Sequence, residues 1–388
     1  MPRQSEVPMW KRSLLAVVVL LAAACSGDGA ADDTRSAPTT GHTHANAPSP
    51  EPLRPGERFL TLEMPEPYSP AAPSGGTDDY RCFLVDPKLT AETFLTGSQF
   101  MPENTDLVHH AIFFRLKPAD LSKAHKADAA TPGVGWTCFG NAGIDAAGWV
   151  ASWAPGANEK LLDPTLGFPL PPGTQLVMQV HYNLLGVDGA APSDQSSIRL
   201  RLNDDVSGMK RLGARLVAAP VELPCTAAES GPLCDRKAAV ADVTKRFGPK
   251  APRRVAGLNQ LCRSGKPPVA GATQQCDFRA KKNATVYAAA GHMHLLGRSI
   301  KIELNPGTPT AKTLLDVPAY DFDDQSIRPL ATPVQVKAGD TYRVTCTHDA
   351  SLRGQLPQLK GQPARYVVWG EGTSDEMCLG MVLQVPTT

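Results

Sequence analysis

The chain has 388 residues, enough for two domains with separate hydrophobic cores. Its 39 basic and 38 acidic side chains give a net charge of +1, so we expect no nucleic-acid partner. With 36 Pro, 33 Gly and few aromatic residues, the composition favours short strands joined by turns over long helices, which predicts an all-β fold.

Residues 1–24 have the pattern of a secretory signal peptide. A short basic stretch precedes the apolar run 14–21, which is too short to span a bilayer as a mature helix. Small residues then lead to Cys25, as in the lipobox of bacterial lipoproteins; the alternative is an ordinary signal peptide followed by a chance cysteine. We predict that Cys25 is lipidated and that this anchor holds the mature chain at the bacterial cell envelope, in the outer membrane.

Residues 25–55 have the composition of a tether behind the lipidated cysteine. Ala, Ser, Thr, Pro, Gly and Asp dominate without apolar periodicity, so this segment cannot bury a core. It contains a His-x-His pair, His42 and His44, but a segment without fixed geometry does not hold metal ligands in place.

The first folded segment, 56–193, contains two strand-like stretches that carry histidines. The stretch 106–115 includes His109 and His110, and the stretch 175–183 includes His181 near its end. Adjacent residues of a regular strand point to opposite faces, so spacing alone predicts that one of the first two histidines is buried and the other exposed. Both can bind one metal ion only if the backbone bulges there or the rings use different nitrogens.

The second folded segment, 194–388, begins near the alternating stretch 197–202 and contains a second pair of histidines. His292 and His294 follow an apolar run, 286–290, that has the pattern of a buried strand. Residues i and i+2 of a strand share a face, so the two imidazoles would lie side by side and could bind one metal. The alternative is a pair of partly exposed strand histidines.

Eight cysteines remain after the predicted lipidation site. An even number in an exported chain implies up to four disulfides, whereas thiolate metal sites would need a Cys-x-x-Cys pattern that the sequence does not contain. We expect the stretch 225–276 to be a disulfide-stapled insertion. The eight are Cys82, Cys138, Cys225, Cys234, Cys262, Cys276, Cys346 and Cys378.

Four motifs, in this order, resemble those of the copper type II, ascorbate-dependent monooxygenases, a family that includes peptidylglycine α-hydroxylating monooxygenase and dopamine β-monooxygenase. The resemblance extends from about residue 57 to the end of the chain, and four motifs in one order are far more specific than any one of them. They are His109-His110, Gln179-Val180-His181-Tyr182, His292-x-His294 and Ser374-Asp375-Glu376-Met377-Cys378.

The resemblance implies two antiparallel β-sandwich domains of jelly-roll-like type, 56–193 and 194–388, with a cleft between them and two coppers per chain. Imidazole suits both oxidation states of copper, while a thioether favours Cu(I). The implied ligands of the electron-supplying copper are His109, His110 and His181, and those of the catalytic copper are His292, His294 and Met377. The implied disulfides are Cys82–Cys138 and Cys346–Cys378; the other four cysteines allow three connectivities.

The activity that the resemblance implies is hydroxylation of a C–H bond with O2 and an external one-electron donor, ascorbate or another. Three polar substrate anchors of the peptide-hydroxylating members are replaced here by Ala290, Leu379 and Met381, which argues against a peptide carboxylate and favours a small or partly apolar substrate. The rival hypothesis is a non-enzymatic copper-binding lipoprotein that buffers or delivers copper, and a third is a sandwich used for partner or glycan binding.

Overall fold

The computed structural model describes residues 49–73, 76–144, 148–155, 157–185, 187 and 189–387, which lie within one compact unit, Asn46–Thr388. The predicted signal peptide, Cys25 and the pair His42 and His44 lie outside the described residues. No helix in the described ranges is both long enough and apolar enough to cross a membrane.

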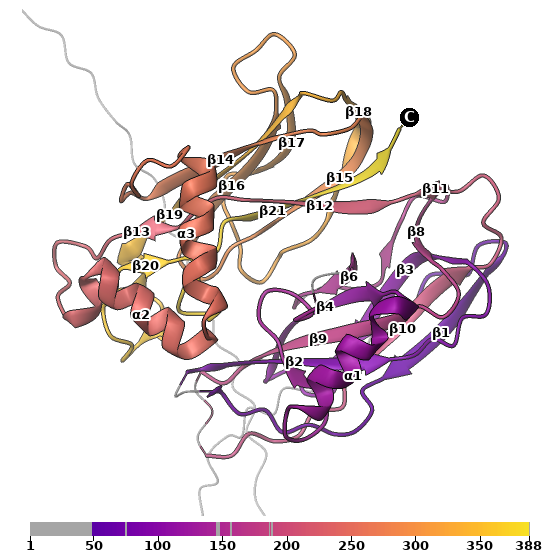
Figure 1. Cartoon of the computed structure of the whole chain (residues 1–388), viewed down its shortest axis with the longest axis horizontal. Coiled ribbons are helices and arrows are strands. Elements are labelled where there is room, and N and C mark those ends of the chain that lie inside the picture. The colour runs from indigo at the N-terminus through magenta and orange to yellow at the C-terminus, as the bar shows by residue number, and fades with distance from the viewer. Residues whose placement is uncertain are drawn as a thin grey trace, which may run out of the picture. The chain divides into compact units, whose positions relative to one another are not determined.

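The N-terminal half consists of two sheets (Figure 1). Most of their strand pairs are antiparallel, but β8 and β11 are parallel. The first sheet contains, in spatial order, β1 (Glu57–Glu63), β10 (Ser197–Asn203), β3 (Thr93–Met101), β8 (Leu166–Leu170) and β11 (Lys210–Arg211), with β7 (Lys160–Leu161) paired to β3. The second contains β5 (Trp136–Thr137), β2 (Asp78–Val85), β9 (Gln175–Asn183), β4 (Val108–Leu116) and β6 (Gly148–Trp153).

The C-terminal half contains two four-stranded antiparallel sheets and a two-stranded ribbon. The first sheet is β12 (Gly213–Ala218), β21 (Leu379–Pro386), β15 (Ala284–His292) and β18 (Arg328–Val336). The second is β14 (Thr273–Arg279), β19 (Thr341–His348), β16 (Gly297–Leu304) and β17 (Lys312–Val317), and the ribbon is β13 (Glu222–Leu223) with β20 (Val367–Val368).

The fold is mostly β with antiparallel sheets, but the all-β expectation is incomplete because the described ranges include three α-helices. The expected insertion 225–276 contains two of them, and α2 packs against α3 and β20 (Figure 1). The helices are α1 (Leu121–Ala129), α2 (Arg236–Phe247) and α3 (Lys250–Cys262); short 3-10 turns are Pro118–Asp120, Pro232–Cys234, Ala350–Gly354 and Pro357–Leu359.

Helix α2 has local signals at both ends that explain why this segment does not form strands. The Asp235 side chain accepts a hydrogen bond from the Ala238 backbone N–H at 2.8 Å and so caps the first turn. The helix ends at Gly248, whose φ of 78° lies in the left-handed region that favours glycine. Cap and terminator together define a twelve-residue helix.

Strand β10 does not begin the second segment, as the alternating stretch 197–202 was expected to do. It pairs with β1 on one side and β3 on the other, so residues up to Asn203, and β11 after them, belong to the first sheet of the N-terminal half. Sequence alternation identifies a strand but not its neighbours, which lie here about 100 and 140 residues away along the chain. Apart from the position of β10, the division into two domains at residue 193 stays a prediction.

Strands β15 and β21 lie between two hydrophobic cores. Val286 and Ala289 belong to the core of the C-terminal half, whereas Ala288, Ala290 and Met381 belong to the core of the N-terminal half. A strand buried on both faces needs a continuous apolar run rather than alternation, which accounts for the run 286–290. The two halves therefore share buried apolar surface along this sheet.

Four disulfides link the eight cysteines of the described residues. Cys82–Cys138 and Cys346–Cys378 are the two pairs that the family resemblance implies. The remaining four cysteines take one of their three connectivities, Cys225–Cys234 and Cys262–Cys276. The second of these ties the end of α3 to β14, so the helical insertion is stapled at both ends as expected.

Arg201 is the largest fully buried side chain of the described residues and forms the polar centre of the first sheet. Its guanidinium donates to the carboxylates of Glu57 at 2.8 Å and Glu159 at 2.9 Å, and to the backbone carbonyls of Glu51 and Pro52. Both carboxylates are themselves almost completely buried. Removal of the cation would leave two buried carboxylates with neutral hydrogen-bond donors, and only Arg54, 4.0 Å from Glu57, as a nearby positive charge.

We expect Arg201→Met to lower the free energy of unfolding by about 3–5 kcal/mol, the cost of breaking a buried ion pair by removing one member. The matched control is Arg211→Met, whose bidentate pair with Glu92 is largely exposed and should contribute no more than about 1 kcal/mol. Urea unfolding of both variants measures the difference. Equal losses would contradict the assignment of Arg201 as the polar centre.

Candidate metal centre

Three histidines of β4 and β9 converge on one point. A register shift lies between Val108 and His110 where β4 pairs with β9, and His110 is directly opposite His181. This is the backbone bulge that two adjacent histidines need in order to face one metal. The Nδ1 atom of His110 lies 3.2 Å from Nδ1 of His109 and 3.2 Å from Nδ1 of His181. All three side chains are buried.

Asp78 orients the third of these imidazoles. Its Oδ1 accepts a hydrogen bond from His181 Nε2 at 2.8 Å, which directs the Nδ1 lone pair of His181 toward His110. The same oxygen accepts from the backbone N–H and the hydroxyl of Thr373, at 3.0 and 2.6 Å. Burial alone would raise the pKa of Asp78, but these hydrogen bonds hold it far below its usual range, so the carboxylate is ionised.

The three imidazoles are neutral at pH 7 and have too few protons to satisfy one another. Burial, followed by the neighbouring imidazoles, lowers the pKa of His109 and of His110 well below the usual value. Because His181 donates its proton to Asp78, the two 3.2 Å contacts of His110 Nδ1 cannot both be hydrogen bonds. A protonated Nδ1 has one proton for two acceptors, and an unprotonated Nδ1 faces the lone pair of His181 Nδ1. Neutral nitrogens that converge in this way fit a bound metal cation.

The second pair of histidines lies where β15 ends. The rings of His292 and His294 have centroids 5.1 Å apart and are nearly perpendicular. His294 Nε2 is buried and has no hydrogen-bond partner among the described residues, while its Nδ1 lies 3.2 Å from the Asp375 carbonyl oxygen. His292 Nδ1 contacts Oε1 of Gln325. Burial, then the neighbouring His294, lowers the pKa of His292 to about 3, so this imidazole is also neutral.

Glu376 joins the His292–His294 segment to Met377. Its fully buried carboxylate accepts hydrogen bonds from the backbone N–H groups of His294 at 2.9 Å, Leu296 at 2.6 Å and Met377 at 3.2 Å. His348 also contacts it, at 3.3 Å. Two segments about 80 residues apart in sequence are therefore held by one side chain.

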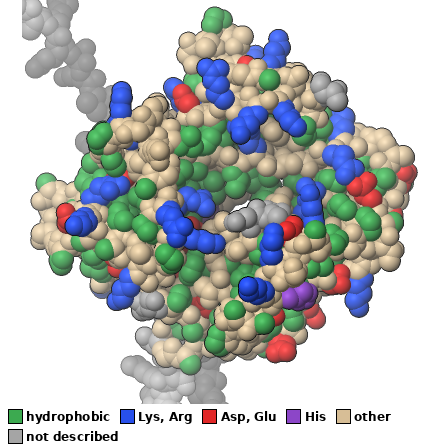
Figure 2. Space-filling model, viewed as in Figure 1, with side chains coloured by type: hydrophobic (Ala, Val, Ile, Leu, Met, Phe, Trp, Pro, Cys, Tyr) green, Lys and Arg blue, Asp and Glu red, His purple; other side chains and the backbone are tan. Residues whose placement is uncertain are grey.

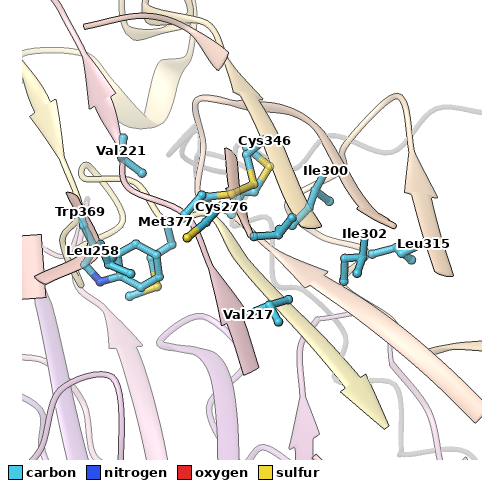
Figure 3. Packing of buried hydrophobic residues seen from close by; sticks show 14 of the residues in the cluster. Val217, Val221, Leu258, Cys276, Ile300, Ile302, Leu315, Cys346, Trp369 and Met377 are labelled. Carbon is cyan, nitrogen blue, oxygen red and sulfur yellow. A yellow bond between two sulfur atoms is a disulfide. The ribbon is translucent and has the colours of Figure 1, made fainter. Parts of the chain in front are cut away.

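Met377 is buried in the core of the C-terminal half. Figure 3 shows its side chain near Trp369 and Leu258, with the disulfide sulfur of Cys346 close by. Antiparallel pairing of β15 with β21 places His292 opposite Leu379, only two residues after Met377. The structure thus brings the third predicted ligand to the same end of the strand pair as the two imidazoles.

The helical insertion supports the segment that carries Met377. Arg246 of α2 donates two hydrogen bonds, each of 2.7 Å, to the two carboxylate oxygens of Asp375. The same carboxylate accepts from the Gly372 backbone N–H at 3.1 Å. A bidentate arginine fixes both the position and the orientation of a carboxylate, so α2 restrains the loop that precedes Met377.

The two sets of predicted ligands lie beside each other. The ring centroids of His110 and His292 are 5.6 Å apart, and Phe322 stacks on His109 at 4.4 Å. The expected solvent cleft between the sets is therefore not confirmed at these rings. The physical reason is the shared burial of β15 and β21, reinforced by the hydrogen bonds from Thr373 to Asp78 across the two halves.

A cavity of about 140 Å³ adjoins both sets of ligands. Most of its lining is apolar, and it includes all three positions where the polar substrate anchors of the peptide-hydroxylating members are replaced, Ala290, Leu379 and Met381. His110, His292 and Met377 also line it. Figure 2 shows a hollow on the viewed face with apolar and basic side chains around it.

Several residues that shape this centre did not emerge from the sequence. Asp78, Glu376 and Gln325 contact the histidine segments, and Tyr80 stacks on His181 with centroids 4.0 Å apart. Glu376 stands inside a motif of the resemblance, so its position was visible although its role was not. Asp78 and Tyr80 are the first and third residues of β2 and carry no signal of metal chemistry, because only the pairing of β2 with β9 brings them to His181.

Gln179, the first residue of the motif Gln179-Val180-His181-Tyr182, lies against a disulfide. Its Nε2 donates to the Asn141 carbonyl oxygen at 2.8 Å and lies 3.4 Å from the sulfur of Cys138. Among the contacts of the described residues, its amide has none with an imidazole. It also lines the cavity.

Residues 268–387 match the family model of the C-terminal domain of copper type II ascorbate-dependent monooxygenases. The matched segment carries His292, His294 and Met377, so the match supports this family for the C-terminal part of the chain and suggests an oxidoreductase that depends on copper. His109, His110 and His181 lie outside the matched residues.

Similarity to solved structures is weak. The VP2 subviral particle of infectious bursal disease virus aligns at 10% identity over 88% of this chain and 74% of that chain, with a TM-score of 0.18. A Paenibacillus xanthan lyase aligns at 11% identity over 87% of this chain and 27% of that chain, with a TM-score of 0.20. At these TM-scores neither structure informs the fold or function of this chain.

Asp78→Asn is expected to weaken copper binding at the three-histidine group by about 10- to 100-fold, because an amide no longer provides the charged acceptor that orients His181. Asp79→Asn is the matched control, since the Asp79 carboxylate binds Tyr68 and the Ala71 backbone instead of a histidine. Competition titration with a copper chelator measures both affinities. An unchanged affinity in Asp78→Asn would remove Asp78 from the metal centre.

Proposed function

We propose that the chain is a copper-dependent monooxygenase that hydroxylates a C–H bond of a small organic substrate, using O2 and an external one-electron donor, ascorbate or another. The observation that carries the proposal is the cluster of neutral, buried and under-protonated imidazoles of His109, His110 and His181. It lies against a second set of ligands within the segment that matches the family model.

The residues present fit two copper ions. His109, His110 and His181 would hold the ion that stores and supplies an electron, and His292, His294 and Met377 the ion at which oxygen and substrate meet. Imidazole serves copper in both oxidation states, and the thioether of Met377 favours the reduced state. Bound copper would supply the redox chemistry and the activation of oxygen.

The remaining groups position these ligands and exclude water. Asp78 sets the tautomer and orientation of His181, and Glu376 holds the backbone of His294 and Met377 in fixed relation. The apolar cavity beside His292 and Met377 would hold the substrate away from bulk solvent. Because the anchors for a peptide carboxylate are absent at 290, 379 and 381, the substrate in this proposal is small and partly apolar.

We further propose the cellular setting and domain division that the sequence predicts. Cys25 would be lipidated after removal of residues 1–24, so the mature chain would be attached to the outer membrane of the bacterial envelope through its lipid alone. Residues 25–55 would form the tether, followed by two β-sandwich domains. The four disulfides support an oxidising compartment, since such bonds persist outside the cytoplasm.

The test is copper stoichiometry and X-ray absorption on the reduced chain, with wild type compared to Met377→Leu. We expect two coppers per chain and a Cu–S contribution that disappears in the variant, with oxygen uptake reduced by at least about tenfold because one soft ligand is lost. Met178→Leu is the matched control: it removes a fully buried methionine of β9, which lies in the N-terminal core, and should change neither signal.

One copper per chain, or an X-ray absorption spectrum that is the same in wild type and Met377→Leu, would contradict the proposed monooxygenase activity. Binding of copper without any oxygen uptake in the presence of a reductant would instead favour the rival function, a copper-handling lipoprotein of the envelope.

A further inference from the structure

Three charged side chains line the cavity beside the candidate metal centre. They come from different elements: Lys160 from β7, Arg254 from α3 and Glu371 from the loop that precedes Met377. Most of the other lining residues are apolar or aromatic, so each charge strongly influences what the cavity can bind. Whether these charges are already compensated within the protein therefore decides the ligand class.

Arg254 and Glu371 make no ion pair with each other within the described residues, and Arg254 is exposed to solvent. Glu371 is buried, and burial raises the pKa of its carboxyl group, while the charge of Arg254 acts in the opposite direction. The Glu371 carboxylate also packs against Gly140, where an added Cβ would lie only 2.7 Å from its Oε1. The arginine is thus solvated, and burial shifts the acid toward its neutral form.

Lys160 is half-buried in the wall of the same cavity. Its side chain makes no hydrogen bond and no ion pair with any residue in the described part of the chain. Burial lowers its pKa to about 8, and the charge of Asp324 only partly opposes that effect. The ammonium group is therefore predominantly protonated at pH 7, and Asp324 acts on it through its charge without a direct ion pair.

Lys160 is also close to the candidate metal centre. Asp324, whose charge acts on Lys160, is the neighbour of Gln325, and Gln325 contacts His292 Nδ1. Both Gln325 and His292 line the same cavity as Lys160. A molecule held by the ammonium group would therefore lie in the cavity that adjoins His292 and Met377.

The walls around Lys160 suit an apolar body. Trp149, Trp153 and Ile112 line the cavity from the N-terminal half, and Leu379 and Met381 line it from the C-terminal half. A volume of about 140 Å³ accommodates on the order of ten water molecules at roughly 10–15 Å³ each, which is the scale of a small organic molecule.

We propose that Lys160 anchors the carboxylate of a small organic acid with an apolar or aromatic body, bound in the cavity beside His292 and Met377. As a substrate, this acid rests on the proposed function; as a ligand, it rests only on Lys160 and the cavity. The carboxylate of the acid supplies a direct counter-ion for the Lys160 ammonium. The apolar part of the acid packs against the cavity wall that the two halves form. The ε-ammonium donates charge-assisted hydrogen bonds to the carboxylate.

Isothermal titration calorimetry on the full chain, copper-free and copper-loaded, tests the anchor with phenylacetate and phenylacetamide as probes. The two probes have the same benzyl group, but phenylacetate is an anion and phenylacetamide is neutral. We expect phenylacetate to bind at least about tenfold more tightly than the amide, because it alone can pair with the ammonium. The copper-free arm excludes direct coordination of the carboxylate by the metal as the source of the preference.

Variants assign the preference to one side chain. Lys160→Met should abolish it and Lys160→Arg should retain it, while Lys123→Met, which removes an exposed lysine of α1, should leave it unchanged. Lys160→Met replaces an unpaired cation with an apolar side chain in an apolar cavity, so its melting temperature should equal or exceed that of wild type.

Equal binding of the two probes, no binding of phenylacetate, or an undiminished preference in Lys160→Met would overturn the anchor. Tighter binding of benzylamine than of phenylacetate would overturn it too and would assign the cavity to cations through Glu371. The proposed function is tested separately. Absence of oxygen uptake would refute the monooxygenase activity, and a Lys160-dependent preference for phenylacetate in the same protein would still support the acid-binding site.

Discussion

The buried carboxylate of Glu376 is the contact on which the candidate centre most depends. It accepts hydrogen bonds from the backbone of His294, Leu296 and Met377, three donors that would otherwise be buried without partners. Burial alone would lower the pKa of the neighbouring His348, but its hydrogen bond and charge interaction with Glu376 raise that pKa above the usual value. One side chain thus holds an imidazole segment and a thioether segment together before any metal binds, which reduces the conformational freedom that binding must restrict.

A second constraint is the double burial of β15 and β21, which joins the halves of the molecule. One face of these strands packs in the C-terminal core and the other in the N-terminal core. The hydrogen bonds from Thr373 to Asp78 lie at the same junction, and so does the bond from the Tyr80 hydroxyl to the Glu371 carbonyl oxygen at 2.6 Å. Since Asp78 also binds His181, the loop before Met377 and the first group of histidines share one anion. Geometry at one set of ligands therefore depends on geometry at the other.

Local patterns predicted much of this arrangement, and their failures have physical explanations. The run 286–290 was correctly interpreted as a buried strand, and the even cysteine count correctly implied disulfides. The prediction from spacing that one of His109 and His110 is exposed was wrong, because the bulge against β9 brings both inward. The helices of 225–276 were missed although Asp235 and Gly248 provide a cap and a terminator, because the composition favoured strands throughout.

The sequence by itself determined the residue types at the centre, their order and the strand character of the segments that carry them, since strand periodicity and ligand chemistry are local properties. Only the tertiary structure decided which residues surround them. Asp78, Gln325 and Lys160 come from separate strands and loops, and their proximity to the histidines follows from strand pairing and shared cores between residues far apart in sequence. Such contacts carry no local signal because they arise when distant segments bury apolar surface together, which no single stretch of the chain can do alone.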